Sequence, residues 1–159
     1  YADYSLEPSL EMMKHPNTVL GLADGGAHVG MICDGSFPTS MLTHWTRDRT
    51  RGDKLSIEWV IRAQCLETAR AYGMHDRGLL APGYKADLNI IDYEGLTLHH
   101  PYMVHDLPAG GKRLAQDADG YVATIVSGVV IQENGNPTGA LPGKLVRGMK
   151  DKPKKMAAE

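Results

Sequence analysis

The chain of 159 residues has little cysteine, little phenylalanine and no excess of charge. Two cysteines, Cys33 and Cys65, are too few for a disulfide framework, so we expect reduced thiols in a cytoplasmic protein. The net charge of −2 and the pI of about 6.4 give no electrostatic reason to expect nucleic acid or an anionic membrane as a partner. No apolar run approaches the roughly 20 residues of a membrane-spanning helix.

The seven histidines lack the spacing of a metal site. No His-x-His, no zinc-protease motif and no zinc-finger pattern occurs. The adjacent pair His99 and His100 would point to opposite faces of an extended segment, which disfavours shared ligation of one ion. We therefore expect the chain by itself not to bind zinc tightly.

Three segments have helical apolar spacing. The first begins near Glu7, because Pro8 is tolerated only at a helix start. The second follows Pro38 and ends in the charged run "RDRTRGDK", where we expect His44 and the arginines 47, 49 and 51 to be solvated. The third runs from Ser56, a plausible N-cap, to Gly73, a plausible C-cap.

The stretch "NTVLGLADGGAHVG", residues 17–30, contains an apolar run that stops at an aspartate. Residues 18–23 lack polar alternation, which is typical of a strand buried on both faces of a parallel sheet. Such a strand needs neighbours, and the chain offers no other parallel strand. A chain that starts at Tyr1 and lacks those neighbours is expected to be the end of something larger.

The second half of the sequence predicts a small antiparallel β part. Residues 87–92, "DLNIID", predict one strand, and residues 121–135 predict a hairpin around the turn Ser127-Gly128. We expect residues 95–120 to be irregular, residues 135–148 to be loop, and the basic tail 149–159 to be disordered.

Two stretches together resemble the amidohydrolase superfamily. They are "GLADGGAHVG" at residues 21–30 and "LSIEWVIRAQCLETARAYGMHDRGLLAPGYKADLNIID" at residues 55–92, which contains the motif RG-x-LAPG-x-x-ADL. The ending "SGVVIQENGNPTGALPGKLVRG" is similar to that of the D-aminoacylase group, the N-acyl-D-amino-acid deacylases. The resemblance covers about residues 15–148.

The resemblance implies an α/β fold: the C-terminal portion of a (β/α)8 barrel in residues 1–78, part of a β-sandwich in residues 79–148, and the tail. Strand eight of such barrels ends in an aspartate at the mouth of the active site. By position that residue is Asp24, which the resemblance makes a catalytic proton carrier and a metal ligand, with zinc as the expected cofactor.

Each candidate residue also has an ordinary structural reading. Asp24 could be a turn residue, since Asp-Gly is a common turn pair. Gly25, Gly26 and His28 are the candidate substrate-binding residues, although a lone loop histidine is more often simply hydrogen-bonded at the surface. Cys33 and Asp34 could line the same pocket or stand in a structural turn. The resemblance makes Asp87 structural, at the turn into a sandwich strand.

One position departs from the deacylase pattern. Where that group has "FPR" this chain has "FPTS", with Thr39 in the place of an arginine that would pair with a substrate carboxylate. The expected parent enzyme hydrolyses the amide of an N-acyl-D-amino acid, a small-molecule substrate. The alternatives are a cyclic amide, as in hydantoinases and dihydroorotases, or a non-catalytic module that self-associates or pairs with the missing barrel segment.

Overall fold

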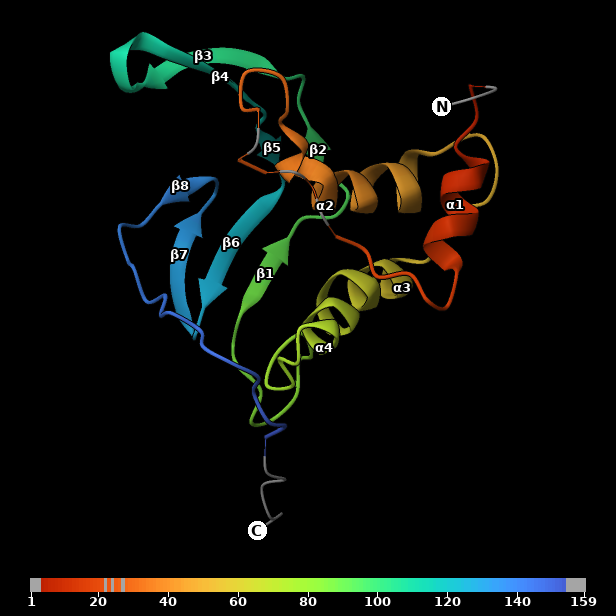
Figure 1. Ribbon diagram of the computed structural model, residues 1–159, viewed down its shortest axis with the longest axis vertical. Helices are drawn as coiled ribbons and strands as arrows, with labels where there is room; N and C mark the ends of the chain where they lie inside the picture. The colour runs from red at the N-terminus through yellow and green to blue at the C-terminus, as the bar shows by residue number, and fades with distance from the viewer. Residues whose placement is uncertain (1–3, 22, 24, 27, 154–159) are drawn as a thin grey trace.

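The computed structural model describes residues 4–21, 23, 25–26 and 28–153. Helical segments occupy the first half of the chain and antiparallel strands the second (Figure 1). The four-stranded sheet and the longest hairpin lie to one side of the helices, and the hairpin projects away from them (Figure 1).

All three predicted helical segments form. Pro8 stands in the first turn of α1. The second segment passes from a short 3-10 turn through an α-helical and then a π-helical stretch. The hydroxyl of Ser56 accepts a 3.2 Å hydrogen bond from Trp59 N, as an N-cap should, and Gly73 has φ +68° after the last turn. The elements are α1 (Glu7–Lys14), η2 (Asp34–Ser36), α2 (Phe37–Ser40), η3 (Met41–Asp48), α3 (Ile57–Arg62), η4 (Ala63–Glu67) and α4 (Thr68–Ala71).

The predicted parallel strand at residues 18–23 is wrong for the residues that can be described. Residues 18–21 and 23 belong to no strand, and Leu22 lies outside the described residues. The strands of the described chain all begin at or after Leu88, and all their pairings are antiparallel. An apolar run without a neighbouring strand has nothing to satisfy its backbone N–H and C=O groups, so it does not form a ladder.

The largest sheet has the strand order β1-β6-β7-β8. The predicted strand at residues 87–92 and the predicted hairpin are both confirmed. Ser127 and Gly128 have φ of +52° and +80°, the left-handed pair that a tight hairpin turn requires. The strands are β1 (Leu88–Ile91), β6 (Tyr121–Val126), β7 (Val129–Glu133) and the short β8 (Asn136–Pro137), which interrupts the predicted C-terminal loop.

Residues 95–120 are not irregular, contrary to the prediction. They contain a two-stranded pair and a longer hairpin whose tip is the 3-10 turn η5. Pro108 and Gly110 stand in this tip, where Ala109 and Gly110 have positive φ. The elements are β2 (Thr97–Leu98), β3 (Tyr102–Leu107), η5 (Pro108–Gly110), β4 (Gly111–Ala115) and β5 (Ala118–Asp119).

One apolar cluster joins the helices to the loop before β2. Leu96 and Val60 are both 0% exposed. Leu96 comes from the β half of the sequence, so residues on both sides of the predicted boundary between residues 78 and 79 pack into one core. The buried members of the cluster are Leu10, Leu42, Trp45, Leu55, Val60 and Leu96.

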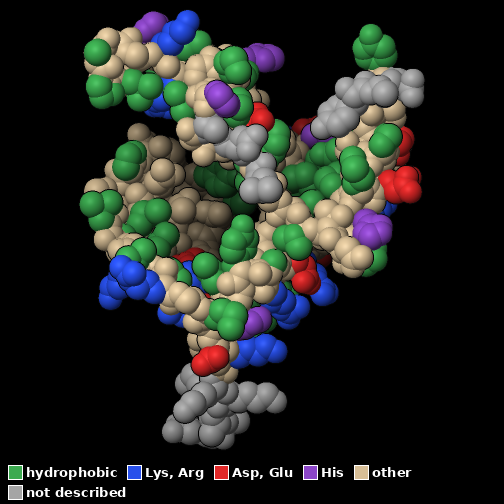
Figure 2. All heavy atoms as spheres, in the orientation of Figure 1, with side chains coloured by type: hydrophobic (Ala, Val, Ile, Leu, Met, Phe, Trp, Pro, Cys, Tyr) green, Lys and Arg blue, Asp and Glu red, His purple; other side chains and the backbone are tan. Residues whose placement is uncertain are grey.

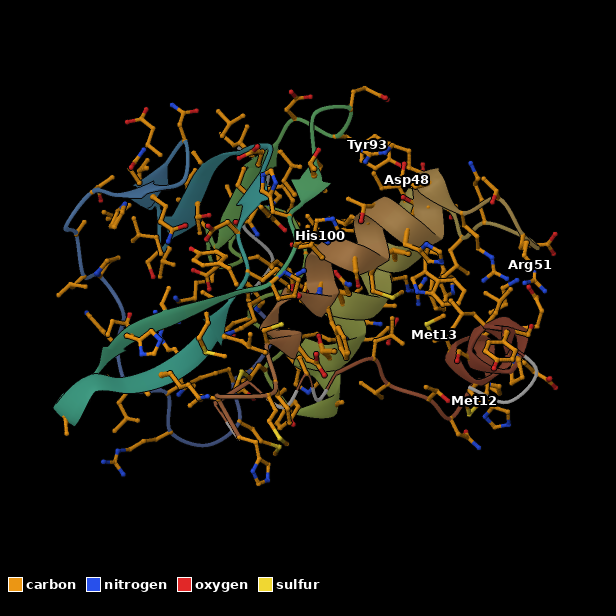
Figure 3. All side chains as sticks on the ribbon, turned by 90° about the horizontal axis from the view of Figure 1, so that it is seen from above. Met12, Met13, Asp48, Arg51, Tyr93 and His100 are labelled. Carbon is orange, nitrogen blue, oxygen red and sulfur yellow. The ribbon has the colours of Figure 1, made fainter. Side chains whose placement is uncertain are left out.

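Arg47 fastens this loop to η3, rather than being solvated as predicted. Its guanidinium donates to Tyr93 O at 2.5 Å and to Leu96 O at 2.8 Å. It also pairs with Asp48 at 2.6 Å, and the hydrogen bond from Arg47 lowers the pKa of Asp48. The Arg47 guanidinium also lies 5.6 Å from the centre of the Tyr93 ring, and Figure 3 labels its two neighbours Asp48 and Tyr93.

Two further predictions about exposed charge are corrected. Arg49 is 4% exposed, lies over the Trp45 ring and forms an ion pair with Glu7. His44 is half-buried, and its Nε2 has no hydrogen-bond partner among the described residues. Both residues line a hollow that they share with Leu6 and Glu7 at the start of α1.

The tail is held at one point. Lys150 N donates to Gly73 O at 2.8 Å, and Lys150 O accepts from His75 N at 2.9 Å. The prediction of disorder is therefore wrong for Lys150, and residues 154–159 lie outside the described residues. In the described part of the chain, no helix has the length and apolar character needed to cross a membrane.

Candidate functional site

A cleft of about 770 Å³ separates the loop at residues 25–36 from the β3–β4 hairpin. Gly25 and Gly26 lie on one wall, and Tyr102 and Gln116 on the other. Figure 2 shows the β3–β4 hairpin standing above the rest of this face of the molecule. The cleft is therefore lined by the loop that follows Asp24 in sequence and by a segment about 80 residues further along the chain.

The loop wall turns sharply at its glycines. Gly26 has φ +95°, a backbone conformation that residues with a Cβ atom rarely adopt. His28 O then accepts hydrogen bonds from Met31 N at 2.8 Å and Ile32 N at 3.0 Å, which closes the next turn. Cys33 and Ser36 follow on the same wall, at the start and end of η2.

The hairpin wall is fixed to the loop by a backbone hydrogen bond. Leu114 N donates to Val29 O at 2.7 Å. Val29 and Leu114 both line the cleft, so this bond sets the separation of its two walls. The site is thus positioned by a contact between a loop and a strand that lie far apart in sequence.

Gln116 is the polar centre of the cleft. Its Oε1 accepts a 2.6 Å hydrogen bond from the Ser36 hydroxyl and lies 3.6 Å from Cys33 Sγ. Its Nε2 donates to His99 O at 2.8 Å. Because these bonds use both ends of the amide, the Gln116 side chain has one defined orientation.

The charged groups of the cleft leave an unbalanced carboxylate. Arg113 and Asp106 form a bidentate pair, with Nε–Oδ1 2.8 Å and Nη2–Oδ2 2.7 Å, and this pairing lowers the pKa of Asp106. Asp117 accepts a 2.8 Å hydrogen bond from the Tyr102 hydroxyl, which raises the pKa of Tyr102. Asp117 has no cationic partner within the described residues.

The predicted site residues divide between the cleft and its surroundings. Asp24, the predicted catalytic residue and metal ligand, lies outside the described residues. Gly25 and Gly26 line the cleft. His28 is exposed and is not among the residues that line it, and Asp34 begins η2 next to the lining residue Cys33.

Thr39 also lines the cleft, at the position where the deacylase pattern has an arginine. It is 7% exposed, and its hydroxyl lies 2.7 Å from the hydroxyl of Tyr121. A neutral hydroxyl pair therefore stands where a cation would bind a carboxylate.

Other candidates have structural roles. Asp87 Oδ1 accepts a 2.8 Å hydrogen bond from Ser127 N and pairs with Lys85, which is the structural role predicted for it. His99 Nε2 lies 2.8 Å from Asp119 Oδ2, so it binds a carboxylate rather than sharing an ion with His100.

The described residues do not form a metal site. Among them, no group of three or more His, Cys, Asp or Glu side chains has the arrangement needed to hold a metal ion. The exposed pair His99–Asp119 supplies only two such side chains. The described part of the chain therefore does not fit a catalytic metal by itself.

A second hollow, of about 710 Å³, lies between the α3–α4 helical segment and β1. Ile61, Cys65 and Leu88 are typical of its lining, which is largely apolar. Burial raises the pKa of the Cys65 thiol, which makes it a poor nucleophile. None of the predicted site residues Gly25, Gly26 and His28 lines this hollow, and it is not the candidate site.

Sequence reasoning missed Tyr102, Gln116 and Asp117, since it treated their segment as irregular. The signal that could have found them is the pair of runs "YMVHDL" and "GKRLA" around the turn "PAG". Two short runs joined by a Gly-containing turn are typical of a hairpin.

Comparisons with known proteins agree on a class of hydrolase. The amidohydrolase family profile matches residues 2–132. The chain therefore belongs to the amidohydrolase family. No solved structure matches it significantly.

The curated relatives are deaminases and are much longer than this chain. Adenine deaminase 1 of Agrobacterium fabrum is 34% identical over 105 residues, 55% of this chain and 17% of that protein. The 5-methylthioadenosine/S-adenosylhomocysteine deaminase of Pelotomaculum thermopropionicum is 30% identical over 139 residues, 80% of this chain and 31% of that protein. Adenine deaminase 1 of Rhizobium meliloti is 54% identical over 33 residues, 21% of this chain and 6% of that protein.

Proposed function

We propose that this chain forms one wall of the active site of a larger enzyme that hydrolyses a C–N bond. The observation that carries the proposal is the family match over residues 2–132. The aligned region makes up only 31% of the Pelotomaculum deaminase. In this proposal residues 1–78 end a (β/α)8 barrel and residues 79–148 contribute to a β-sandwich.

Asp24 is the proposed catalytic residue. Gly25 and Gly26, which follow it directly in sequence, line the cleft, and this supports the proposed role of Asp24. A carboxylate there would accept a proton from the attacking water and pass it to the leaving nitrogen. Gly25 and Gly26 would let the substrate approach the backbone, with His28 at the rim.

Members of the family are generally metal-dependent, and zinc is the metal that we propose for the larger enzyme. Asp24 is the one residue of this chain proposed to touch it. The remaining ligands would come from outside the described residues, which contain no set of three. The isolated chain is therefore expected to be inactive and to bind zinc weakly.

The proposed substrate is the amide of an N-acyl-D-amino acid, supported by the resemblance of residues 127–148 to the D-aminoacylase group. A second candidate is the exocyclic amine of a purine, supported by the names of the deaminase relatives. Cyclic amides form the third candidate. All three reactions share attack of water on a carbon bonded to nitrogen.

The test uses the product of the complete reading frame that contains this chain. The purified enzyme, loaded with zinc, is assayed for release of free amino acid from N-acyl-D-amino acids and of ammonia from adenine derivatives. Asp24→Asn should lower kcat by about 100-fold or more, since a general acid–base group contributes at least that much. Asp53→Asn, a matched change at an exposed loop carboxylate, should stay within about two-fold of wild type. Equal activity of the Asp24→Asn enzyme would reject the proposed role.

The alternative is a non-catalytic module that self-associates or pairs with a missing segment. Sedimentation of the isolated chain tests it, since a monomer has a mass of 17.3 kDa. The non-catalytic module would be favoured if the isolated chain sediments as a larger species and the protein encoded by the complete reading frame hydrolyses neither class of substrate. Stoichiometric zinc with amidase activity in the isolated chain would contradict the statement that this chain alone is inactive.

A further inference from the structure

The cleft between the loop at residues 25–36 and the β3–β4 hairpin has a defined charge. Arg113 is its one cationic side chain among the described lining residues, and Asp106 occupies two of its guanidinium nitrogens. Asp117 adds a second carboxylate without a cationic partner there. The described lining therefore has a formal charge of −1.

The hydrogen bonds within the cleft also leave an acceptor open to a ligand. The Tyr102 hydroxyl donates to Asp117 Oδ2, and none of the described residues donates to Asp117 Oδ1. Ser36 donates to Gln116, so its hydroxyl hydrogen is also used. Asp117 Oδ1 is therefore an open acceptor, whereas the remaining N–H groups of Arg113 belong to a guanidinium that already pairs with Asp106. An open carboxylate oxygen accepts from hydroxyl and amino groups.

The walls are also fixed before a ligand arrives. The backbone bond between Leu114 and Val29 and the Ser36–Gln116 bond join the loop to the hairpin. A ligand that donates to Asp117 would bind without ordering these segments. An anion would meet the carboxylate of Asp117 and an arginine whose charge Asp106 already balances.

We infer that this cleft selects the part of the substrate remote from the scissile bond, and that Asp117 and Tyr102 make it accept a non-anionic group bearing hydroxyl or amino donors. The inference rests on the proposed function and narrows its substrate class. For an acyl amino acid the group is a neutral or basic side chain, and for a purine derivative it is an unphosphorylated sugar. Asp117 is the specificity-determining residue because it supplies the unbalanced charge.

The test compares pairs of probes in which one member has an additional anionic group, using this chain and equilibrium dialysis at low salt. One pair is N-acetyl-D-glutamine and N-acetyl-D-glutamate, and the other is adenosine and adenosine 5′-monophosphate. In at least one pair the probe that lacks the extra negative charge should bind about ten-fold more tightly, and added salt of about 0.5 M should shrink this ratio of affinities. The pair that shows the preference identifies the source of the group.

Three variants separate charge from shape. Asp117→Asn should reduce the ratio to about two-fold, because it removes the charge and keeps the size. Tyr102→Phe should leave the ratio of the two affinities unchanged, since the carboxylate of Asp117 remains. It should weaken the binding of both probes of a pair equally. Asp119→Asn, two residues away and outside the cleft lining, should behave as wild type.

The outcomes that overturn the inference are specific. Equal or tighter binding of the more negatively charged probe in both pairs would reject it. An unchanged ratio of affinities in Asp117→Asn, or no binding of any of the four probes, would also reject it. The proposed function fails separately, if the protein encoded by the complete reading frame hydrolyses neither class of substrate. Hydrolysis with no charge preference would retain the function and reject the inference.

Discussion

The hydroxyl of Ser36 donates a 2.6 Å hydrogen bond to Gln116 Oε1, although 80 residues separate them in sequence. This bond connects the end of the loop that follows Asp24 to the strand segment after the β3–β4 hairpin. It is part-buried, so water replaces it poorly when it is lost. The candidate site depends on this connection between the two halves of the chain.

Ser36→Ala should therefore lower the free energy of unfolding by about 1 kcal/mol, the usual net value of a part-buried neutral hydrogen bond. Urea denaturation followed by circular dichroism measures the change. Ser40→Ala removes a bond from Ser40 to Phe37 O, which is exposed and local, and should cost less than about 0.5 kcal/mol. Equal losses in both variants would mean that the Ser36–Gln116 bond does not stabilise the fold.

Arg47→Ala should be far more destabilising, by about 2–3 kcal/mol. The variant leaves Tyr93 O and Leu96 O without their charged donor, and Leu96 belongs to the buried core. Arg62→Ala is the control: its ion pair with Glu67 is exposed and should contribute less than about 1 kcal/mol. Thermal unfolding of both variants distinguishes the two roles, and similar melting temperatures would contradict the role of Arg47.

Gly120→Ala should destabilise the chain by more than about 2 kcal/mol. Gly120 has φ +99°, and an added Cβ would lie 2.6 Å from Leu96 Cα, a backbone atom that cannot move away cheaply. Gly128 also has positive φ, +80°, but its Cβ would meet open space. Gly128→Ala should therefore cost only about 1 kcal/mol. A smaller loss at Gly120 than at Gly128, measured by denaturation, would reject the close-packing argument.

The hydrogen bond between Tyr102 and Asp117 predicts a pH dependence. It raises the pKa of Tyr102 above its usual value, chiefly because the phenol donates to the carboxylate. The folded state therefore holds this proton more tightly than the unfolded state. The resulting stabilisation is complete below about pH 10, the pKa of an unperturbed tyrosine, and is lost as pH rises through the higher folded value.

NMR titration of ¹³C-labelled tyrosines measures this directly. Asp117→Asn should move the pKa of Tyr102 down towards its usual value, because the charged acceptor is removed. Asp119→Asn should leave it in place. A Tyr102 titration that does not respond to Asp117→Asn would show that the bond is absent in solution.

Local sequence determined the elements whose signals are local. Pro8 and Ser56 fixed helix starts, and the Ser127-Gly128 pair fixed the β6–β7 turn, because backbone φ preference and capping act within a few residues. The resemblance in residues 21–30 and 55–92 likewise indicated the amidohydrolase family, which the profile match confirms.

The tertiary structure decided where apolar runs and charges are placed. Residues 18–23 have a strand's composition, but a strand forms only with a partner for its backbone groups, and composition does not reveal a partner. Arg47 and Arg49 belong to a charged run that is typical of a solvated helix end. In the structure, however, Arg47 donates to Leu96 O in the loop before β2, and Arg49 forms an ion pair with Glu7. Sequence spacing cannot show these contacts.

The sequence by itself determined the family, the helices and the β6–β7 hairpin. Only the tertiary structure brought Gly25 and Gly26 opposite Tyr102, Gln116 and Asp117 and so formed the cleft. The physical reason is range. Propensity and capping act within one turn of the chain, whereas the cleft is made by hydrogen bonds between groups about 80 residues apart.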